Sequence, residues 1–436
     1  MSSDNAQLLS NTQAVSSDLA FGLKPSMVRS RQYRHSIAPS NKNTFSAGDQ
    51  MIFYIPGGRR NTFLLSDQSY LRLTIKNTDA TNFCNLESGY AVLNRQDIFH
   101  SSNLCESIQQ LNVLATDLLD FSMNASDRQG ESAILGTEDG VTNGMTAIRQ
   151  GYKINANSSV TVCLPIMSGV IGTGCNKLLP IGMLNDDIRI EWTLASSVEG
   201  VVSNTAAVTY QVTYAELVVS ILELSDEGMA LVSQTMTNPL YIPGNSWRSY
   251  VSSLPASAGS FSFLVPARFA SLKSLICCPR YETTTATAYS VSSRTNPNIT
   301  AYNWRIGSAI VPQKQVNLIN DATTSGYAEA FAEILKERHA IDSLINCTSV
   351  SAAYFNVAGN VNSAANGYKN AFSIHQELET VPHRSDVLAS GVNTLSSQVF
   401  FEGSITTAPA NTFTLNFYAN YDHVLVLQDG ILSVRF

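Results

Sequence analysis

Strict alternation of apolar and polar side chains is the feature that most constrains how this chain can fold. It is clearest in the stretch LLPIGMLNDDIRIEWTLAS (178–196), from residue 187 onward. A period of two is the spacing of a β-strand, whose successive side chains point to opposite faces of the sheet. The alternation therefore predicts a strand with one face buried in a core. The residues predicted to be buried are Ile188, Ile190, Trp192 and Leu194.

Similar strand signals recur in both halves of the chain. The first half carries them at residues 49–56, 69–77, 106–115, 158–166, 187–195 and 208–224. The second half carries them at residues 259–266, 271–279, 371–378, 397–405, 411–420 and 423–436. In the last of these, Asp429-Gly430 fits the two-residue turn of a type I′ hairpin. Many short strands between turn-rich loops, with no convincing helix in the first half, predict an all-β sandwich or barrel.

The two halves of the chain also share a plan. A length of 436 residues suits two domains of roughly 200 residues each. YIPGG (54–58) opens the first half and YIPGN (241–245) the second, which favours duplication of one domain. Each half then carries one long insertion, at 116–157 and 280–345. We predict a partly ordered N-terminal arm at 1–47, a first β-domain at 48–224, a connection at 225–238 and a second β-domain at 239–436.

One helix is predicted inside the second insertion, at residues 326–339 (GYAEAFAEILKERH). Its large apolar residues recur at helical spacing and would form a stripe along one side. A loop as long as 280–345 is usually functional or ordered by a partner. We therefore expect the insertion to be chiefly an inter-subunit or outer-surface element. The candidates for an inter-subunit contact are Tyr327, Phe331, Ile334 and Leu335.

The sequence contains no residue pattern typical of an active site or a metal site. Its six histidines are scattered, without the HxH or HExxH spacing of a metal site. The glycine-rich GVIGTG (169–174) lies among strands with no helix after it, so we interpret it as a loop rather than a phosphate-binding turn. Cys277 and Cys278 are interpreted as core residues. We expect no enzymatic activity, no metal, no cofactor and no small-molecule substrate.

Charged residues make up only 14% of the chain, against roughly 25% in average soluble proteins. Two interpretations stay open. β-Proteins with many turns often have this composition. Alternatively, much of the surface is buried against copies of the same chain, where unpaired charges are costly to desolvate. The net charge of −7 argues against a protein that binds a polyanion over its whole surface.

Other sequence features bear on the compartment. No apolar run approaches the roughly 18 residues of a membrane span. The N-terminal MSSDNAQLLSNTQ has neither a basic region nor an apolar run, so we expect no secretory signal. The seven cysteines form an odd count with no CxxC pair, which predicts free thiols in a reducing compartment.

The N-terminal arm carries one cluster of charge, MVRSRQYRH (27–35). The arm lacks the apolar periodicity needed to fold alone, so any order in it would come from a partner. We predict that Arg29, Arg31 and Arg34 lie on the inner side of an assembly. There they would contact a neighbouring subunit, a minor protein, or an anionic layer such as lipid headgroups or genome, since arginine suits carboxylate and phosphate. The alternative is a solvated tail without a role.

Several segments resemble double jelly-roll major capsid proteins of viruses. KLLPIGMLNDDIRIEWTLAS (177–196) resembles the late strand of the first jelly roll, in which an LP loop precedes an alternating strand. The resemblance is closest to Polinton-like viruses, virophages and adintoviruses, and it covers nearly the whole chain from about residue 45. Four further segments match in order and spacing: QMIFYIPGGRRNTFLLSDQSYLRLTIKN (50–77), DIFHSSNLCESIQQLNVLA (97–115), SSRTNPNITAYNWRIGSAIVP (292–312) and LASGVNTLSS (388–397).

The resemblance implies an all-β fold of two tandem eight-stranded jelly-roll barrels, with long loops and a short helix in the second. It implies a major capsid protein that forms homotrimers, which are pseudo-hexagonal capsomers of an icosahedral DNA virus shell. The implied partners are other copies of the chain, penton and minor capsid proteins, and an anionic layer beneath the shell. The implied location is the virion, assembled inside the host cell.

Two other functions stay open on the sequence alone. A coat protein of a single-stranded RNA virus commonly carries a strongly basic arm, whereas residues 1–48 hold five basic and two acidic residues, a balance of +3. A carbohydrate-binding β-sandwich adhesin would need an exposed aromatic platform. Trp192 is better explained as core, and Trp247 and Trp304 are open candidates for such a platform.

Overall fold

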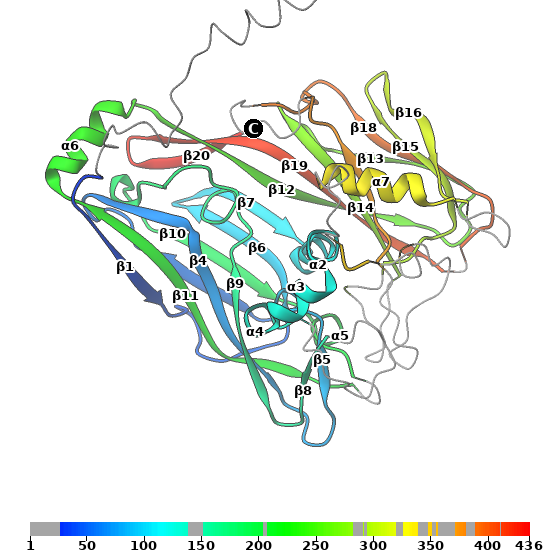
Figure 1. Ribbon diagram of the computed structural model, residues 1–436, viewed down its shortest axis with the longest axis horizontal. Coiled ribbons are helices and arrows are strands. Elements are labelled where there is room, and N and C mark those ends of the chain that lie inside the picture. Colours follow the sequence, from blue (N-terminus) through cyan, green and yellow to red (C-terminus); the bar gives the residue numbers. More distant parts are fainter. Residues whose placement is uncertain are drawn as a thin grey trace, which may run out of the picture.

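The computed structural model of the chain describes residues 27–137, 151–203, 207–281, 291, 294–319, 326–338, 348–350, 355, 371–380, 389–409 and 411–436. These residues form a mostly β structure of two barrels side by side, with helices between the barrels and at one end of the molecule (Figure 1). None of the described helices is long and apolar enough to cross a membrane.

Two antiparallel sheets build the first barrel. One has the order β1 (Ser30–Ile37), β11 (Tyr210–Leu224), β4 (Thr62–Asn77), β9 (Ser159–Pro165). The other has the order β3 (Gln50–Ile55), β10 (Ile188–Leu194), β6 (Leu93–His100), β7 (Asn103–Gln109). The short β2 (Phe45–Ser46) also pairs with β11, and β5 (Cys84–Leu86) pairs with β8 (Tyr152–Ile154) in a small separate ladder.

The second barrel is built in the same way. One sheet has the order β12 (Leu240–Leu254), β19 (Phe413–Gln428), β14 (Leu272–Tyr281), β17 (Ile374–Glu377). The other has the order β13 (Ser260–Val265), β18 (Val399–Ile405), β15 (Ile299–Ile306), β16 (Ala309–Asn317). β20 (Ile431–Arg435) adds to β19 through Asp429 and Gly430, whose φ angles of 51° and 77° fit the predicted type I′ turn.

The two barrels share one strand order. When the eight main strands of each barrel are numbered along the chain, one sheet reads 1-8-3-6 and the other 2-7-4-5 in both barrels. This connectivity, in which the first strand lies beside the last, is that of a jelly roll. The prediction of two tandem eight-stranded jelly rolls is confirmed.

The core of the first barrel shows why the alternating sequence forms a strand there. Along β10, buried and partly buried residues alternate without a break. The Trp192 ring meets Phe53 edge-on, with 5.5 Å between the ring centroids. Its Nε1–H donates to Gln96 Oε1 at 2.9 Å, so the one polar atom of this buried ring is satisfied. The four residues predicted for this face are all buried: Ile188, Ile190, Trp192 and Leu194.

A helix, α2 (Leu111–Ser122), replaces the second half of the strand predicted at 106–115. β7 ends at Gln109, and Gln110 takes a left-handed conformation that turns the chain into the helix. α2 is apolar on both sides, since Leu114 lies in the core of the first barrel and Phe121 in the core of the second. A helix buried all round lacks the one-sided pattern by which helices are predicted from sequence.

Further helices lie outside the two barrels. Two short ones, α3 (Ala125–Gly130) and α4 (Ser132–Leu135), fall in the insertion that the sequence predicted at 116–157. α6 (Asp226–Thr235) joins the two barrels, and α7 (Ala328–Glu337) falls inside the predicted helix 326–339. The remaining short helices are η2 (Gly89–Val92), η3 (Ile181–Met183) and α5 (Ser197–Gly200).

The first barrel begins earlier than predicted. Residues 30–37, assigned to the N-terminal arm, form β1 and pair with β11 over their full length. β1 lies at the edge of its sheet and most of its side chains are exposed, so it carries no apolar alternation.

The repeated YIPG motif does not lie at equivalent positions in the two barrels. YIPGG ends β3, the second strand of its barrel, whereas YIPGN lies in β12, the first strand of the other.

The segment 280–345 is not a simple insertion. Its described part contains β15 and β16, which complete one sheet of the second barrel. Trp304 of β15 lies in the core, with its ring centroid 4.7 Å from that of Phe401. A deletion of residues 285–320 would therefore remove barrel strands rather than a surface element. Within this segment, residues 282–290, 292–293, 320–325 and 339–345 lie outside the described part.

Candidate assembly site

Helix α2 carries two aspartates into the junction between the barrels. The helix lies between the two barrels (Figure 1), and Asp117 and Asp120 are both fully buried. Arg294, which follows β14 in the second half of the chain, pairs with both, and its Nη1 lies 3.3 Å from Asp117 Oδ1. Arg128 of α3 pairs with Asp120 at 2.8 Å. Burial disfavours the protonated form of Arg294. The carboxylates of Asp117 and Asp120 have the larger effect and raise the pKa of Arg294, so the cluster is ionised.

His375 of β17 extends this cluster into the second barrel. Its Nε2 lies 2.9 Å from Asp117 Oδ2, and its Nδ1 lies 3.1 Å from Glu337 Oε2 at the end of α7. Burial disfavours the protonated ring, but the two carboxylates outweigh it and raise the pKa of His375 above its usual value. We call the set Asp117, Asp120, Arg294, Glu337 and His375 the ionic contact.

A second contact across the junction is built on glycines. Asn245 of β12 donates its backbone N–H to the Gly174 carbonyl at 2.9 Å. A Cβ atom at Gly169 would lie 2.4 Å from the Asn245 carbonyl oxygen, and one at Gly174 would lie 2.3 Å from it. Only glycine allows this approach. The GVIGTG segment is thus a loop, as predicted, and its glycines let two backbones of different barrels meet.

Polar side chains complete the same contact. Glu106 of β7 accepts from the Gly169 backbone N–H at 2.8 Å and from the Ser246 hydroxyl of β12. His423 of β19 lies 3.1 Å from the Gly169 carbonyl through Nε2. Burial lowers the pKa of His423 to about 4, so the neutral ring donates this hydrogen bond. We call the set Glu106, residues 169–174, residues 244–246 and His423 the glycine contact.

Apolar packing continues across the junction as well. The core around β10 also includes Ile276, Cys278 and Tyr418 of the second barrel, and the Tyr418 hydroxyl donates to the Gln110 carbonyl at 2.8 Å. Cys277 and Cys278 are both buried, as the sequence predicted. The two barrels are therefore joined by apolar, ionic and close-packed contacts, and this junction can position them as one unit.

The arginines predicted to contact a partner lie on or beside the edge strand β1. All three are exposed. Arg31 pairs with Glu223 at 3.4 Å, and Arg34 lies over the ring of Tyr70, 5.6 Å from its centroid. Arg29 accepts a backbone hydrogen bond from Ser225 at 3.0 Å, at the start of α6. The segment that carries them begins beside α6, where Ser30 pairs with Leu224.

The apolar side of α7 packs in large part on its own chain. Ile334 is fully buried in the second core, and Phe331 meets Phe355 edge-on with 5.0 Å between centroids. Tyr327 packs beside the same ring at 5.9 Å, and Leu335 is half-buried. These four residues are covered to this extent by their own chain, because α7 lies on β17 and β16. The contact with another subunit that was predicted for them stays a prediction.

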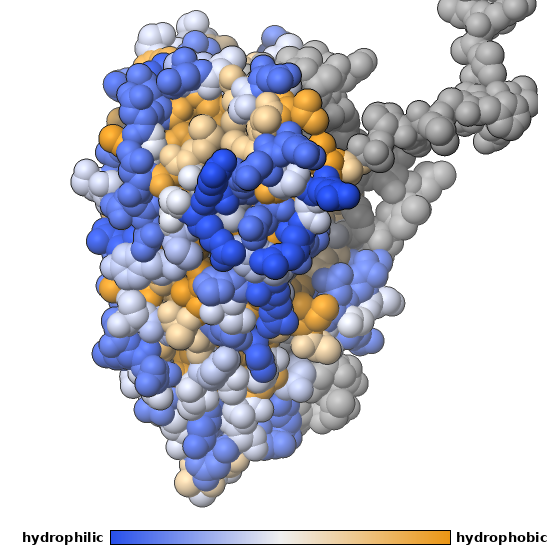
Figure 2. All heavy atoms as spheres, turned by 90° about the vertical axis from the view of Figure 1, so that its left-hand side faces the viewer, coloured by the Kyte–Doolittle hydropathy of each residue, from blue (hydrophilic) through white to orange (hydrophobic). Residues whose placement is uncertain are grey.

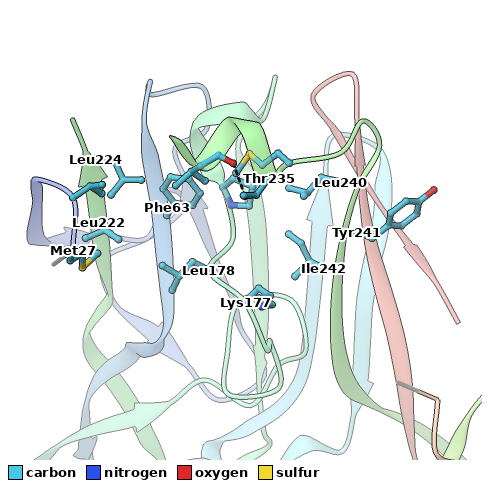
Figure 3. Close-up of a pocket in the computed structure, with 14 residues that line it drawn as sticks. Met27, Phe63, Lys177, Leu178, Leu222, Leu224, Thr235, Leu240, Tyr241 and Ile242 are labelled. Carbon is cyan, nitrogen blue, oxygen red and sulfur yellow. Dashed lines mark hydrogen bonds between the residues drawn. The ribbon is translucent and has the colours of Figure 1, made fainter. Parts of the chain in front are cut away.

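One apolar groove was not predicted from the sequence. It has a volume of about 430 Å³ and lies between α6, the ends of β4 and β11, and the start of β12 (Figure 3). Figure 2 shows hydrophobic residues gathered on the face that carries α6. The signal that could have revealed the groove is the apolar spacing in SDEGMALVSQTMTN (225–238), which was interpreted only as a connection.

In the described part of the chain, no group of three His, Cys, Asp or Glu residues could hold a metal ion.

Comparisons with known proteins agree on the fold. No family model and no curated protein matches this sequence. Among solved structures, a chain of the PBCV-1 virus capsid matches at a TM-score of 0.60 and 12% identity, covering 95% of this chain and 98% of that one. The Faustovirus major capsid protein matches at 0.60 and 8%, covering 96% and 93%. A chain of the Sputnik virophage matches at 0.57 and 11%, covering 98% and 93%. This chain therefore shares the double jelly-roll fold of these viral capsid proteins.

Proposed function

We propose that this chain is a major capsid protein, the structural subunit of an icosahedral DNA virus shell. Three copies associate into a pseudo-hexagonal capsomer, and capsomers associate into the shell. The observation that carries the proposal is the pairing of two jelly rolls of identical strand order in one unit. Three copies of a two-barrel unit bring six similar barrels around one axis, which gives a hexagonal outline to a threefold assembly.

The junction supports this role. A subunit that tiles a shell needs its two barrels held at a fixed angle, and the ionic and glycine contacts hold them from buried positions. The low content of charged residues, 14% of the chain, suits a surface that is largely covered by neighbouring copies. We assign the chain no enzymatic reaction and place it in the virion.

The end of the molecule that carries α6 is proposed to face the interior of the shell. The described chain begins there, beside α6 (Figure 1), and Arg29, Arg31 and Arg34 lie on or beside β1 and are exposed. Guanidinium groups in this position suit carboxylates of a neighbouring subunit or of a penton or minor capsid protein, and also phosphates of lipid headgroups or genome.

The other candidate functions have less support. An adhesin would need an exposed aromatic platform, but Trp192 and Trp304 are buried and Trp247 is only half-exposed at the junction. An RNA virus coat with a shell and a projecting domain would not need two barrels of one strand order.

Light scattering coupled to size-exclusion chromatography tests the proposal. The purified chain should elute with three times the 47.2 kDa mass of one copy. Negative-stain images of the same peak should show hexagonal outlines. A monomer at all concentrations would contradict the proposal, and so would spontaneous closed shells built from single copies without trimers.

A further inference from the structure

The groove beside α6 is open and almost wholly apolar. Leu178 and Tyr241 on its rim are 38% and 52% exposed, so the groove and its rim form one exposed apolar patch. Lys177 is the one charged residue among those that line it. The apolar residues that line the groove are Met27, Val28, Phe63, Leu178, Pro180, Leu222, Leu224, Val232, Met236, Leu240, Tyr241 and Ile242 (Figure 3).

The N-terminal segment leads directly from this groove. Met27 and Val28, the first described residues, form part of its wall. Val28 is held against α6, since a Cβ at Gly228 would come within 2.9 Å of Val28 Cγ2. The backbone bond from Ser225 to Arg29 fixes the next residue. Residues 1–26 are therefore tethered at the edge of an apolar surface.

The tethered segment contains matching apolar residues. Leu19, Phe21 and Leu23 alternate with smaller or polar residues in DLAFGLKPSM (18–27). Four residues of extended chain span at most about 14 Å, so Leu23 is within reach of the groove next to Met27. Tethering also gives the segment a high effective concentration, on the order of millimolar for short flexible linkers.

We propose that Leu19, Phe21 and Leu23 of the same chain bind in this groove. Cavities of roughly 300–1,000 Å³ hold ligands the size of several side chains, and this one has about 430 Å³. Docking would cover the exposed apolar face of the end that carries α6. The inference does not depend on the capsid role.

Hydrogen exchange on the full-length chain tests the proposal from the side of the groove. The triple variant Leu19→Ser, Phe21→Ser, Leu23→Ser should exchange several-fold faster than the wild type at residues 226–242. It should also bind the apolar dye ANS more strongly. The matched control, Leu8→Ser with Leu9→Ser, changes apolar residues of the same segment and should behave as the wild type.

The reciprocal variant tests the proposal from the side of the segment. Leu178→Asp places a charge on the groove rim and should speed exchange at residues 15–26. Leu395→Asp, at a leucine that is 48% exposed and outside the groove, should not. Circular dichroism checks that each variant keeps its β structure.

Three results would overturn the proposal. In the first, the wild type and the triple serine variant exchange and bind dye equally, so the segment does not cover the groove. In the second, protection at 226–242 is lost on dilution together with an oligomer, so a second copy covers the groove. In the third, protection appears only with vesicles of anionic phospholipid, so a membrane surface covers it.

Discussion

The two contacts across the barrel junction join the same barrels by different chemistry. The ionic contact buries ionised side chains that pair with one another, whereas the glycine contact brings backbones together and keeps His423 neutral. A buried ion pair is weak evidence for net stability, but removal of one partner leaves a buried charge alone. A close backbone approach is instead sensitive to a single added methyl group. The junction can therefore be weakened in two different ways, by loss of a charged partner in the ionic contact or by added volume in the glycine contact.

The largest expected effect is on the ionic contact. Arg294→Met removes the partner that Asp117 and Asp120 share, so unfolding should become easier by about 3–5 kcal/mol. Urea unfolding followed by tryptophan fluorescence measures the change. Arg60→Met, which breaks the exposed pair with Asp226 at 3.3 Å, is the control and should cost no more than about 1 kcal/mol. Equal small losses in both variants would mean that the ionic contact does not stabilise the junction.

The next largest effect is on the pH dependence of stability, which should differ between the two contacts. The pKa of His423 is about 4 in the folded chain and about 6.5 when unfolded, so the unfolded chain takes up a proton first as pH falls. Stability should therefore decrease between pH 6.5 and 4, by up to about 3 kcal/mol. His423→Gln should lose this part of the pH dependence. Parallel curves for the variant and the wild type would show that His423 is not buried as described.

The ionic contact should respond in the opposite direction. The pKa of His375 is raised in the folded chain, so its protonated ring contributes stability fully below about pH 6.5. That contribution is lost as pH rises through the raised pKa. The difference in unfolding free energy between the wild type and His375→Gln should thus shrink toward alkaline pH. A difference that grows with pH would contradict the assignment of charge between Asp117 and Glu337.

The smallest expected effect is on the glycine contact. Gly169→Ala places a Cβ atom 2.4 Å from the Asn245 carbonyl and should cost about 1–3 kcal/mol through overpacking. Gly259→Ala has no heavy atom within 4 Å and serves as the matched control. Thermal unfolding by circular dichroism measures both. If Gly169→Ala is as stable as Gly259→Ala, the loop is able to move away and does not hold the barrels.

The sequence predicted the fold wherever one side of an element is solvated. β10 shows its buried face directly, because Arg189 and Glu191 alternate with the core residues. α2 was missed because both barrels cover it, and β1 was missed because most of its side chains are exposed. Neither leaves a one-sided pattern. The junction depends on contacts between residues far apart in sequence, such as Asp117 and His375, and no local spacing reports those.

Single-particle cryo-electron microscopy of the purified chain tests the central claim most directly, because it images the barrels themselves. The account predicts a closed trimer in which six jelly rolls surround one threefold axis, two from each chain and at one fixed angle. Monomers, or particles in which the two barrels of a chain take variable angles, would contradict it.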